Sequence, residues 1–286
     1  MKKIVVIVFF VYMLFPCAAQ VNRALLVGIE DYPTESGWNK IHAHNDLDLV
    51  RAALISNGVL PKNIIELRDE NATLSSIRKA FQSLSKVARS GDNVIVFFSC
   101  HGQRITDLNG DDPDGLDEAL IPFDALMEYG QRGYKGENHL VDDEINALLH
   151  SITNRITPRG HLLLLLDACH SGDGDRDVYS EDAQEYYRGV DKDFIIPMHN
   201  KHNSGMTSMP DRPWTSISAC KDYQTNYEIA INGRYYGRLA YAFCQCWNMG
   251  LSDAELIESI QRYYESLPAT PRGFKQVLDY YCPEND

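Results

Sequence analysis

The sequence predicts an α/β fold with a mostly parallel β-sheet, and two observations support this. Short apolar runs of strand length alternate with longer segments of helical periodicity, as in βαβ units with right-handed crossovers. Two of these runs, 93–99 and 161–167, lead directly to His101 and Cys169. Because chemistry in open α/β sheets gathers beyond the carboxyl ends of the strands, we expect these two residues to be neighbours in space.

The first part of the chain repeats strand and helix. Thr73 or Ser75 is a suitable N-cap for one of the helices, and Gly58 ends the other. The predicted strands cover 24–29, 63–67 and 93–99, and the predicted helices cover 45–57 and 73–88.

The second part continues the pattern after an acidic, glycine-containing loop at 107–118. Residues 173–212 are polar and predict a mobile surface loop that joins two halves of one α/β domain over residues 20–286. Asn232-Gly233 predicts a hairpin turn. The remaining predicted elements are helices at 142–152, 236–247 and 253–267, with strands at 161–167, 214–219 and 227–231.

Residues 1–19 have the features of a secretory signal peptide. Two lysines precede an apolar segment at 4–15, and small residues end at Ala19. A membrane anchor is the alternative, but the apolar segment is shorter than the ~20 residues that a spanning helix needs. Lipidation at Cys17 is disfavoured by Pro16. We expect cleavage after Ala19 and a secreted or periplasmic protein.

The composition is acidic, with a formal net charge of -13. Loss of Lys2 and Lys3 with the signal peptide changes this value to -15, which argues against nucleic acid as a partner. An acidic protein of this kind is suited to bind basic peptides or divalent cations, although the need for solubility alone also explains the negative charge. Six cysteines follow the signal peptide, and their spacing shows no small-domain disulfide framework, so their pairing stays open.

Cys169 and His101 are candidates for a catalytic nucleophile and base. A thiol attacks a carbonyl as the thiolate, which needs a nearby histidine, and the oxyanion needs backbone donors. The N–H groups of Gly102 and Cys169 can provide these donors. The alternatives are a buried structural cysteine with an ordinary turn histidine, and a zinc site. That zinc site would comprise Cys100, His101, Cys169 and His170.

Two motifs around these residues resemble the catalytic blocks of metacaspases and related bacterial caspase-like peptidases. They are Ser99-Cys100-His101-Gly102-Gln103 and Asp167-Ala168-Cys169-His170-Ser171-Gly172. The resemblance extends from about Arg23 to the C-terminus. It implies a caspase-hemoglobinase fold, with a mostly parallel six-stranded sheet flanked by helices. It also implies a cysteine endopeptidase that cleaves polypeptides after Arg or Lys and needs no cofactor for its chemistry.

The same resemblance implies a substrate pocket lined by Asp46, Ser99 and Asp167. Two carboxylates at the base of a pocket would pair with a guanidinium or an ammonium group, whereas a pocket for aspartate would need arginines. Each residue also has a purely structural explanation. Asp46 could stabilise the N-terminal end of a helix through the helix dipole, and Asp167 could favour a turn at the end of a strand.

Calcium activation is a further implication of the resemblance. Calcium-dependent family members have aspartates that correspond to Asp117, Asp142 and Asp143, with another shortly after the nucleophile. The candidates for that last position are Asp173, Asp175 and Asp177. Hard oxygen ligands in this number suit calcium, although acidic loops are often only solvated.

The 173–212 loop is also a candidate for self-processing. An enzyme that cleaves after basic residues could cut its own exposed loop at Arg176, Arg188, Lys192 or Lys201.

Two alternatives to this interpretation stay open. One is a clostripain-like or gingipain-like protease of the same clan, which would share the histidine and cysteine blocks but not the Asp46, Ser99 and Asp167 pocket. The other is an inactive caspase-like scaffold used for binding. The physiological substrate does not follow from the sequence. No sequence feature specifies an oligomer, and we expect a monomer.

Overall fold

The computed structural model describes residues 20–169, 186–190, 192–197 and 212–283. The predicted signal peptide lies outside these ranges. A six-stranded sheet forms the centre, in the order β11-β8-β7-β3-β1-β2. All its neighbouring strands are parallel except β11, which is antiparallel to β8. The prediction of a mostly parallel six-stranded sheet flanked by helices is confirmed.

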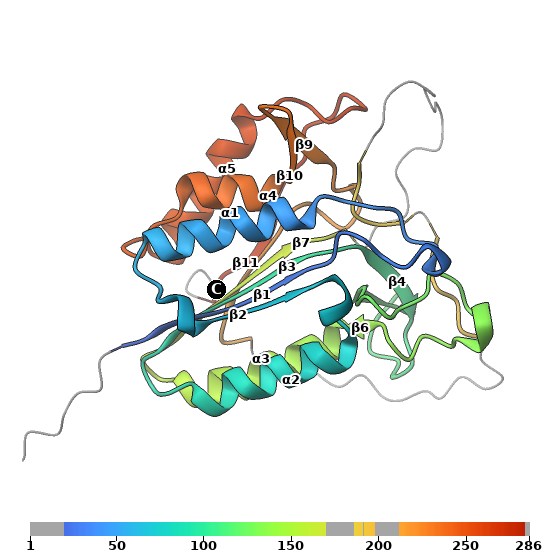
Figure 1. The fold of residues 1–286 in the computed structure, drawn as a ribbon, viewed down its shortest axis with the longest axis horizontal. Coiled ribbons are helices and arrows are strands. Elements are labelled where there is room, and N and C mark those ends of the chain that lie inside the picture. Colours follow the sequence, from blue (N-terminus) through green and yellow to red (C-terminus); the bar gives the residue numbers. More distant parts are fainter. Residues whose placement is uncertain (1–19, 170–185, 191, 198–211, 284–286) are drawn as a thin grey trace, which may run out of the picture.

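The helices cover both faces of this sheet (Figure 1). One layer holds α1, α4 and α5, and the other holds α2 and α3. The parallel strands are buried on both faces, which explains their nearly continuous apolar sequences. The helices are α1 Ala43–Ser56, α2 Leu74–Val87, α3 Asp142–Ile156, α4 Arg238–Cys246 and α5 Asp253–Ser266. The central strands are β1 Asn22–Gly28, β2 Ile64–Arg68, β3 Asn93–Ser99, β7 His161–Asp167, β8 Thr215–Ser218 and β11 Asp279–Tyr281.

Two small sheets stand outside the central one. The first is antiparallel and follows β3 directly, so that Gly102 begins a strand instead of forming a turn. It contains β4 Gly102–Thr106, β5 Leu116–Leu120 and β6 Leu140–Val141. The second is the predicted hairpin, with Asn232 and Gly233 at φ values of 50° and 79° in its turn. Its strands are β9 Glu228–Ile231 and β10 Arg234–Gly237.

Local sequence signals explain where the helices begin. The Thr73 hydroxyl accepts a hydrogen bond from the Ser76 N–H at the start of α2. Ser252 and Glu255 form a capping box at the start of α5. None of the helices that the structure describes is both long and apolar enough to cross a membrane.

Candidate active site

His101 and Cys169 lie at the carboxyl ends of neighbouring parallel strands. The β3–β7 ladder aligns Ser99 with Asp167, and each reactive residue follows two positions after its strand ends. His101 and Cys169 are both buried, each with 2% of its surface exposed. The sheet thus brings together two strand ends that are 68 residues apart in the chain.

Neighbouring groups fix the ring of His101. Its Nε2 donates to the carbonyl oxygen of Asn39 at 2.7 Å. The ring stacks on Trp38 at a centroid distance of 5.2 Å and contacts Tyr32 at 5.3 Å. Burial lowers the pKa of His101 to about 4, and the bond to Asn39 opposes this only in part. The imidazole is therefore neutral near pH 7. Its Nδ1, which has no hydrogen-bond partner in the described part of the chain, can accept a proton.

Cys169 shares a hydrogen-bond acceptor with a second cysteine. The Sγ atoms of Cys169 and Cys220 donate to the carbonyl oxygen of Gln224 at 3.1 and 3.2 Å. Both residues line an open cavity of about 690 Å³ that extends to Tyr223 on one side and Asp142 on another. The Cys169 side chain therefore borders open space despite its low exposure.

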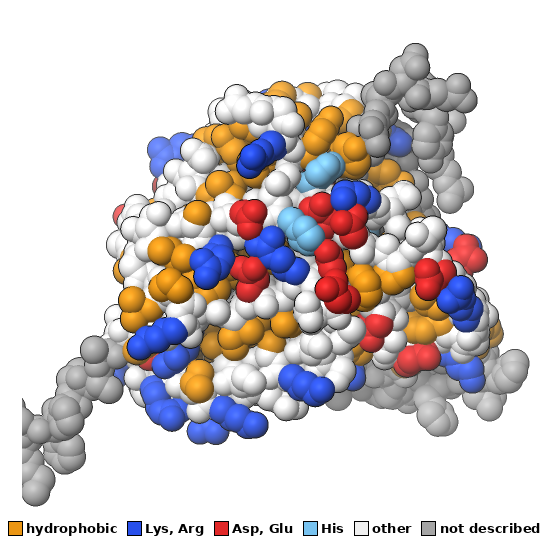
Figure 2. Space-filling model, viewed as in Figure 1, with side chains coloured by type: hydrophobic (Ala, Val, Ile, Leu, Met, Phe, Trp, Pro, Cys, Tyr) orange, Lys and Arg blue, Asp and Glu red, His pale blue; other side chains and the backbone are white. Residues whose placement is uncertain are grey.

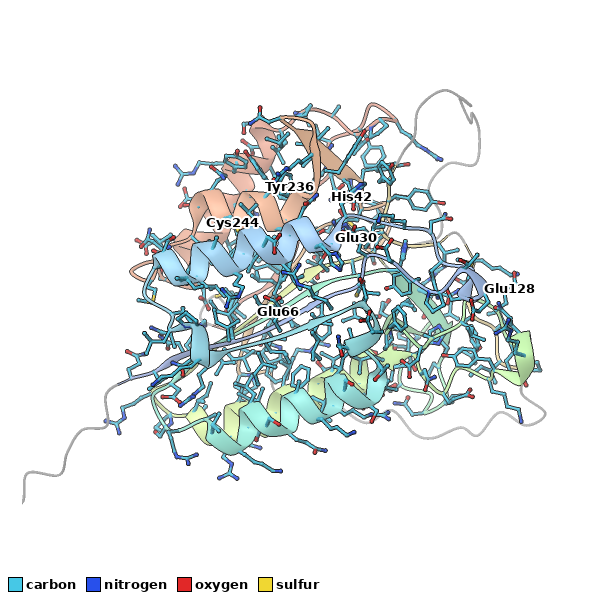
Figure 3. The ribbon with its side chains drawn as sticks, viewed as in Figure 1. Glu30, His42, Glu66, Glu128, Tyr236 and Cys244 are labelled. Atoms are coloured by element: carbon cyan, nitrogen blue, oxygen red, sulfur yellow. The ribbon has the colours of Figure 1, made fainter. Side chains whose placement is uncertain are left out.

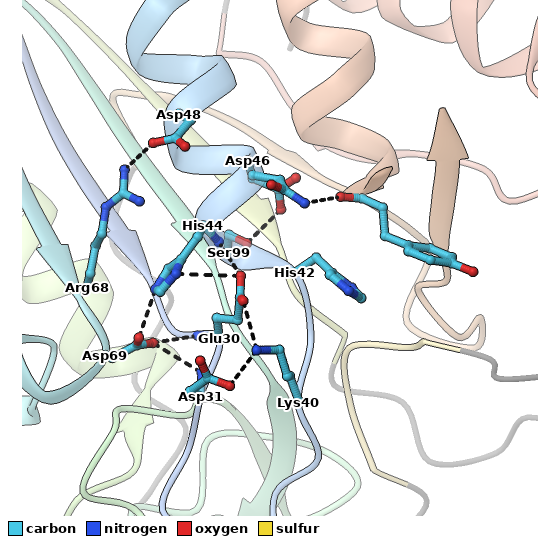
Figure 4. Close-up of polar contacts among 12 residues, drawn as sticks. Glu30, Asp31, Lys40, His42, His44, Asp46, Asp48, Arg68, Asp69 and Ser99 are labelled. Atoms are coloured by element: carbon cyan, nitrogen blue, oxygen red, sulfur yellow. Dashed lines mark hydrogen bonds and ion pairs between the residues drawn. The ribbon is translucent and has the colours of Figure 1, made fainter. Parts of the chain in front are cut away.

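Asp46, Ser99 and Asp167 lie together beside these strand ends. Asp46, in the first turn of α1, accepts a hydrogen bond of 2.8 Å from the Ser99 hydroxyl (Figure 4) and another of 2.8 Å from the Gly237 N–H. Asp167 accepts a bond of 2.8 Å from the side-chain amide of Asn226. All three predicted pocket residues are fully buried. Such a cluster of buried carboxylates requires a compensating cation.

That cation is the guanidinium of Arg188, which is also fully buried. Its Nη2 lies 2.6 Å from Asp46 and 2.9 Å from Glu228. Its Nη1 donates to the Ser99 hydroxyl at 2.8 Å and lies 3.4 Å from Asp167. The planar fork of an arginine side chain can satisfy acceptors on several sides at once, which explains this multiple contact.

The pocket holds three carboxyl groups against one guanidinium. Burial raises the pKa of Asp46 to about 7, and repulsion from Asp167 and Glu228 adds to this, while Arg188 opposes it. Burial also acts to raise the pKa of Glu228, but attraction to Arg188 and hydrogen bonds from His42 bring it down to about 2. The pocket therefore has enough negative charge to keep a bound cation protonated.

Residues 186–190 cross the pocket like an added β-strand. The Arg188 N–H donates to the Asn226 carbonyl at 3.0 Å, and the Glu228 N–H donates to the Tyr186 carbonyl at 2.9 Å. These bonds give the segment an antiparallel partner just before β9. Main-chain pairing of this kind is the common way in which extended peptides bind to proteins.

Gly189 follows Arg188 and lies against Cys169. A Cβ atom at this glycine would be 2.8 Å from the carbonyl oxygen of Cys169 and 3.2 Å from its Cβ. The peptide bond between Arg188 and Gly189 therefore lies beside the reactive cysteine. The expectation of an exposed loop is wrong for Arg188, because the buried acidic pocket binds its charge. Lys192 is exposed as expected, whereas Arg176 and Lys201 lie outside the described residues.

Two aspartate groupings are formed by the loop between β4 and β5, by Asp117 on β5 and by the start of α3. Asp112, Asp117 and Asp142 form one grouping, with ligand atoms within 4.8 Å of one another. Asp107, Asp111 and Asp117 form the other. The Oδ1 atoms of Asp117 and Asp142 are buried and have no hydrogen-bond partner in the residues that the structure describes.

The charges of these aspartates repel one another. Burial raises the pKa of Asp117 to about 8 and that of Asp142 to about 6, and neighbouring aspartates add to both shifts. Of the predicted calcium ligands, Asp117 and Asp142 meet, but Asp143 accepts a hydrogen bond from Asn109 and belongs to neither grouping. Asp173 lies outside the described residues. A hard cation would relieve the repulsion, so the aspartates fit calcium.

The cysteines and histidines of 20–169, 186–190, 192–197 and 212–283 form no metal-binding group, and His170 of the zinc alternative lies outside these residues. No disulfide joins the six cysteines in these ranges. Gly102 follows His101 and pairs with Leu120, and its role with Cys169 as an oxyanion donor stays a prediction.

The surface next to the pocket carries charges of both signs. Lys40 pairs with Glu30 and Asp31, and His44 pairs with Asp69 (Figure 4). Basic side chains are dispersed among acidic ones on the face that Figure 2 shows.

Sequence reasoning missed Glu228, Asn226 and Arg188 as parts of this site. Glu228 contacts the guanidinium, and Asn226 orients Asp167 while receiving a bond from Gln276 at 2.9 Å. The available signal was a pair of polar residues where the hairpin begins, Asn226 just before β9 and Glu228 at its first position.

Comparisons with known proteins agree with this architecture. The family model described as the caspase domain of peptidase family C14 matches residues 21–284. Metacaspase-1 of Lodderomyces elongisporus is 26% identical over 82% of this chain and 60% of its own length. Metacaspase-1 of Candida albicans is 28% identical over 78% of this chain and 57% of its own length. The chain thus spans about three fifths of the length of these two relatives.

Metacaspase III c of Phaeodactylum tricornutum is 31% identical, over 55% of this chain and 44% of its own length. Among solved structures, protein GSU0716 from Geobacter sulfurreducens matches with a TM-score of 0.61 and 22% identity. That match covers 91% of this chain and 92% of the other, and it shows the shared fold.

Proposed function

Because the chain belongs to the caspase-domain family of C14 peptidases, we propose that it is a cysteine endopeptidase that cleaves polypeptides after Arg or Lys. One observation carries the preference for basic residues. The guanidinium of Arg188 is buried among Asp46, Ser99, Asp167 and Glu228, and the following peptide bond lies beside Cys169. Arg188 thus occupies the position of the substrate residue before the cleaved bond, here named P1.

The catalytic roles follow from the protonation state of His101. The neutral imidazole takes the thiol proton of Cys169 at Nδ1, and the thiolate attacks the carbonyl carbon of the P1 residue. The N–H groups of Gly102 and Cys169 stabilise the oxyanion. The imidazolium then donates its proton to the leaving amine, and water hydrolyses the acyl-enzyme. The Asn39 carbonyl keeps the ring oriented through both steps.

The same geometry favours self-processing between Arg188 and Gly189. The segment occupies the pocket as a substrate would, so it also blocks other substrates until it is cut. A linker tethered next to the site acts at a high effective concentration, on the order of millimolar for short tethers. Cleavage at this bond would convert a self-blocked chain into an active one.

Peptide hydrolysis tests this proposal. Fluorogenic peptides ending in Arg, Lys or Asp would be offered to the wild type and to Cys169→Ala, while new chain termini are mapped by mass spectrometry. We expect Cys169-dependent hydrolysis of the Arg and Lys peptides only, together with a new N-terminus at Gly189. Absence of Cys169-dependent turnover would favour the inactive scaffold. Turnover without a cut at Gly189 would reject the self-processing step alone.

Calcium activation is the second part of the proposal. Asp112, Asp117 and Asp142 would hold the ion, which would supply positive charge to carboxyl groups that now repel one another. We expect calcium to raise the thermal stability of the wild type but not of Asp117→Asn. Asp114→Asn, an exposed change in the same loop, is the matched control and should keep the calcium response.

We also propose that residues 1–19 direct export and are removed, so that a monomeric enzyme acts in the periplasm or outside the cell. The intact mass of the exported protein and its elution on size exclusion test both points. A mass that includes residues 1–19 would contradict the cleavage.

A further inference from the structure

The segment that occupies the pocket also has an aromatic side chain in a second, separate contact. Tyr186 lies two residues before Arg188, at the position named P3. Its ring meets His42 edge-on, at a centroid distance of 4.5 Å and an angle of 86°. It contacts Tyr235 at 4.8 Å and 64°. Aromatic pairs prefer edge-to-face contacts at these distances, so both contacts of Tyr186 have favourable geometry.

The two residues that contact Tyr186 are themselves held in place. The ring of His42 stacks on Tyr235 at 4.9 Å and 23°. His42 Nδ1 bonds to Glu228 at 2.6 Å, and its backbone N–H donates to the same carboxylate at 2.8 Å. The Tyr235 carbonyl accepts from the side-chain amide of Asn45 at 3.0 Å. The aromatic site is therefore built by His42, the N-cap residue of α1, and by Tyr235 of β10, and both are held by residues outside the segment that fills it.

Glu228 connects this site with the P1 pocket. One of its oxygens contacts Arg188, and the carboxylate also orients His42. The spacing of the two sites matches an extended chain, because side chains two residues apart in a strand lie on the same side. Tyr187 lies between them and contacts Tyr227 at the longer distance of 6.2 Å. The arrangement therefore distinguishes P3 from the intervening position, P2.

We propose that His42 and Tyr235 form a P3 subsite for an aromatic side chain, so that preferred substrates have the order aromatic residue, any residue, basic residue before the cleaved bond. This inference rests on the proposed peptidase function and extends it. Main-chain bonds to Asn226 and Glu228 would align the substrate, and the P1 and P3 side chains would give selectivity.

Three acetylated fluorogenic peptides test the subsite: Tyr-Ala-Arg, Ala-Tyr-Arg and Ala-Ala-Arg. They are offered to the full chain, and kcat/KM is measured for each. Two ring contacts predict that Tyr-Ala-Arg is cleaved roughly tenfold more efficiently than Ala-Ala-Arg. Ala-Tyr-Arg should stay within about threefold of Ala-Ala-Arg, since its tyrosine lies at P2.

Substitutions on β10 test which residue binds the P3 side chain. Tyr235→Ala should remove the preference for tyrosine at P3, whereas Tyr235→Phe keeps the ring and should keep the preference. Tyr236→Ala is the matched control, because this neighbouring residue on β10, labelled in Figure 3, contacts Tyr241 instead. If Tyr235→Ala does not fold, the three peptides on the wild type still decide the question.

The outcomes separate the two proposals. No hydrolysis of any arginine peptide, either by the wild type or by an Arg188→Ala chain in which the segment cannot block the P1 pocket, rejects the peptidase function. Hydrolysis of Ala-Ala-Arg without a preference for tyrosine at P3 rejects the subsite and leaves the peptidase intact. A preference that persists in Tyr235→Ala also rejects the subsite as assigned.

Discussion

Replacement of Asp46 by asparagine should impair cleavage after arginine while it keeps the shape of the pocket. Asp46 is fully buried, and one of its oxygens lies 2.6 Å from the guanidinium of Arg188. It also accepts hydrogen bonds from Ser99 and Gly237. An asparagine would have only one accepting oxygen, so its amide group would face one of these two donors. The variant loses a charge and one good acceptor together.

The size of the effect follows from the remaining charges. Two unit charges about 4 Å apart interact by about 4 kcal/mol at an effective dielectric constant near 20. Glu228 and Asp167 still face the guanidinium in the variant, so part of the attraction persists. We therefore expect a loss of about 2–4 kcal/mol, which corresponds to roughly 30-fold to 1,000-fold in kcat/KM.

The assay compares arginine and citrulline peptides on the Arg188→Ala chain, in which the linker cannot compete. Citrulline has nearly the shape of arginine but no charge, so Asp46→Asn should lower the arginine-to-citrulline ratio strongly. Asp48→Asn is the control, because Asp48 lies on the same helix and pairs with Arg68 in an exposed salt bridge. A loss below about threefold, or an equal loss for both peptides, would refute the assignment of Asp46 to the P1 pocket.

Three further results are expected from the acidic pocket, from Asp117 and from Gly189. Because Arg binding favours the ionised form of Asp46, whose pKa is about 7 with the pocket filled, kcat/KM for arginine peptides should rise as the pH increases through and above this value. Citrulline peptides should lack this rise in kcat/KM, and parallel pH profiles for the two peptides would contradict the prediction. The raised pKa of Asp117, about 8, favours the protonated folded state, so without calcium the stability should fall as pH rises from about 4 to 8. Thermal melting of Asp117→Asn should show a smaller fall. Gly189→Ala adds a Cβ 2.8 Å from the Cys169 carbonyl, and about 1–3 kcal/mol of overpacking should slow the linker cut roughly 5-fold to 150-fold on a gel time course. An unchanged rate would show that the bond is cut in another geometry.

The order of strands and helices could be predicted because their signals are local. The continuous apolar runs at β3 and β7 and the cap at Thr73 each depend on a few neighbouring residues. The short strands β4, β5 and β6 were missed, since each has at most five residues, and polar residues such as Gln103 and Asp117 take buried positions in them, so no apolar alternation marks them. Their pairing depends on contacts between segments that no local pattern describes.

The sequence by itself determined the parallel sheet and the strand ends that carry His101 and Cys169, because buried parallel strands need apolar residues and their ends meet at one edge. Only the tertiary structure decided what fills the acidic pocket. Arg188 lies in a polar stretch that reads as a surface loop, and its burial depends on charges from Asp46, Asp167 and Glu228 in three distant segments. Electrostatic attraction between such segments acts through space, so it becomes visible only when the chain is folded.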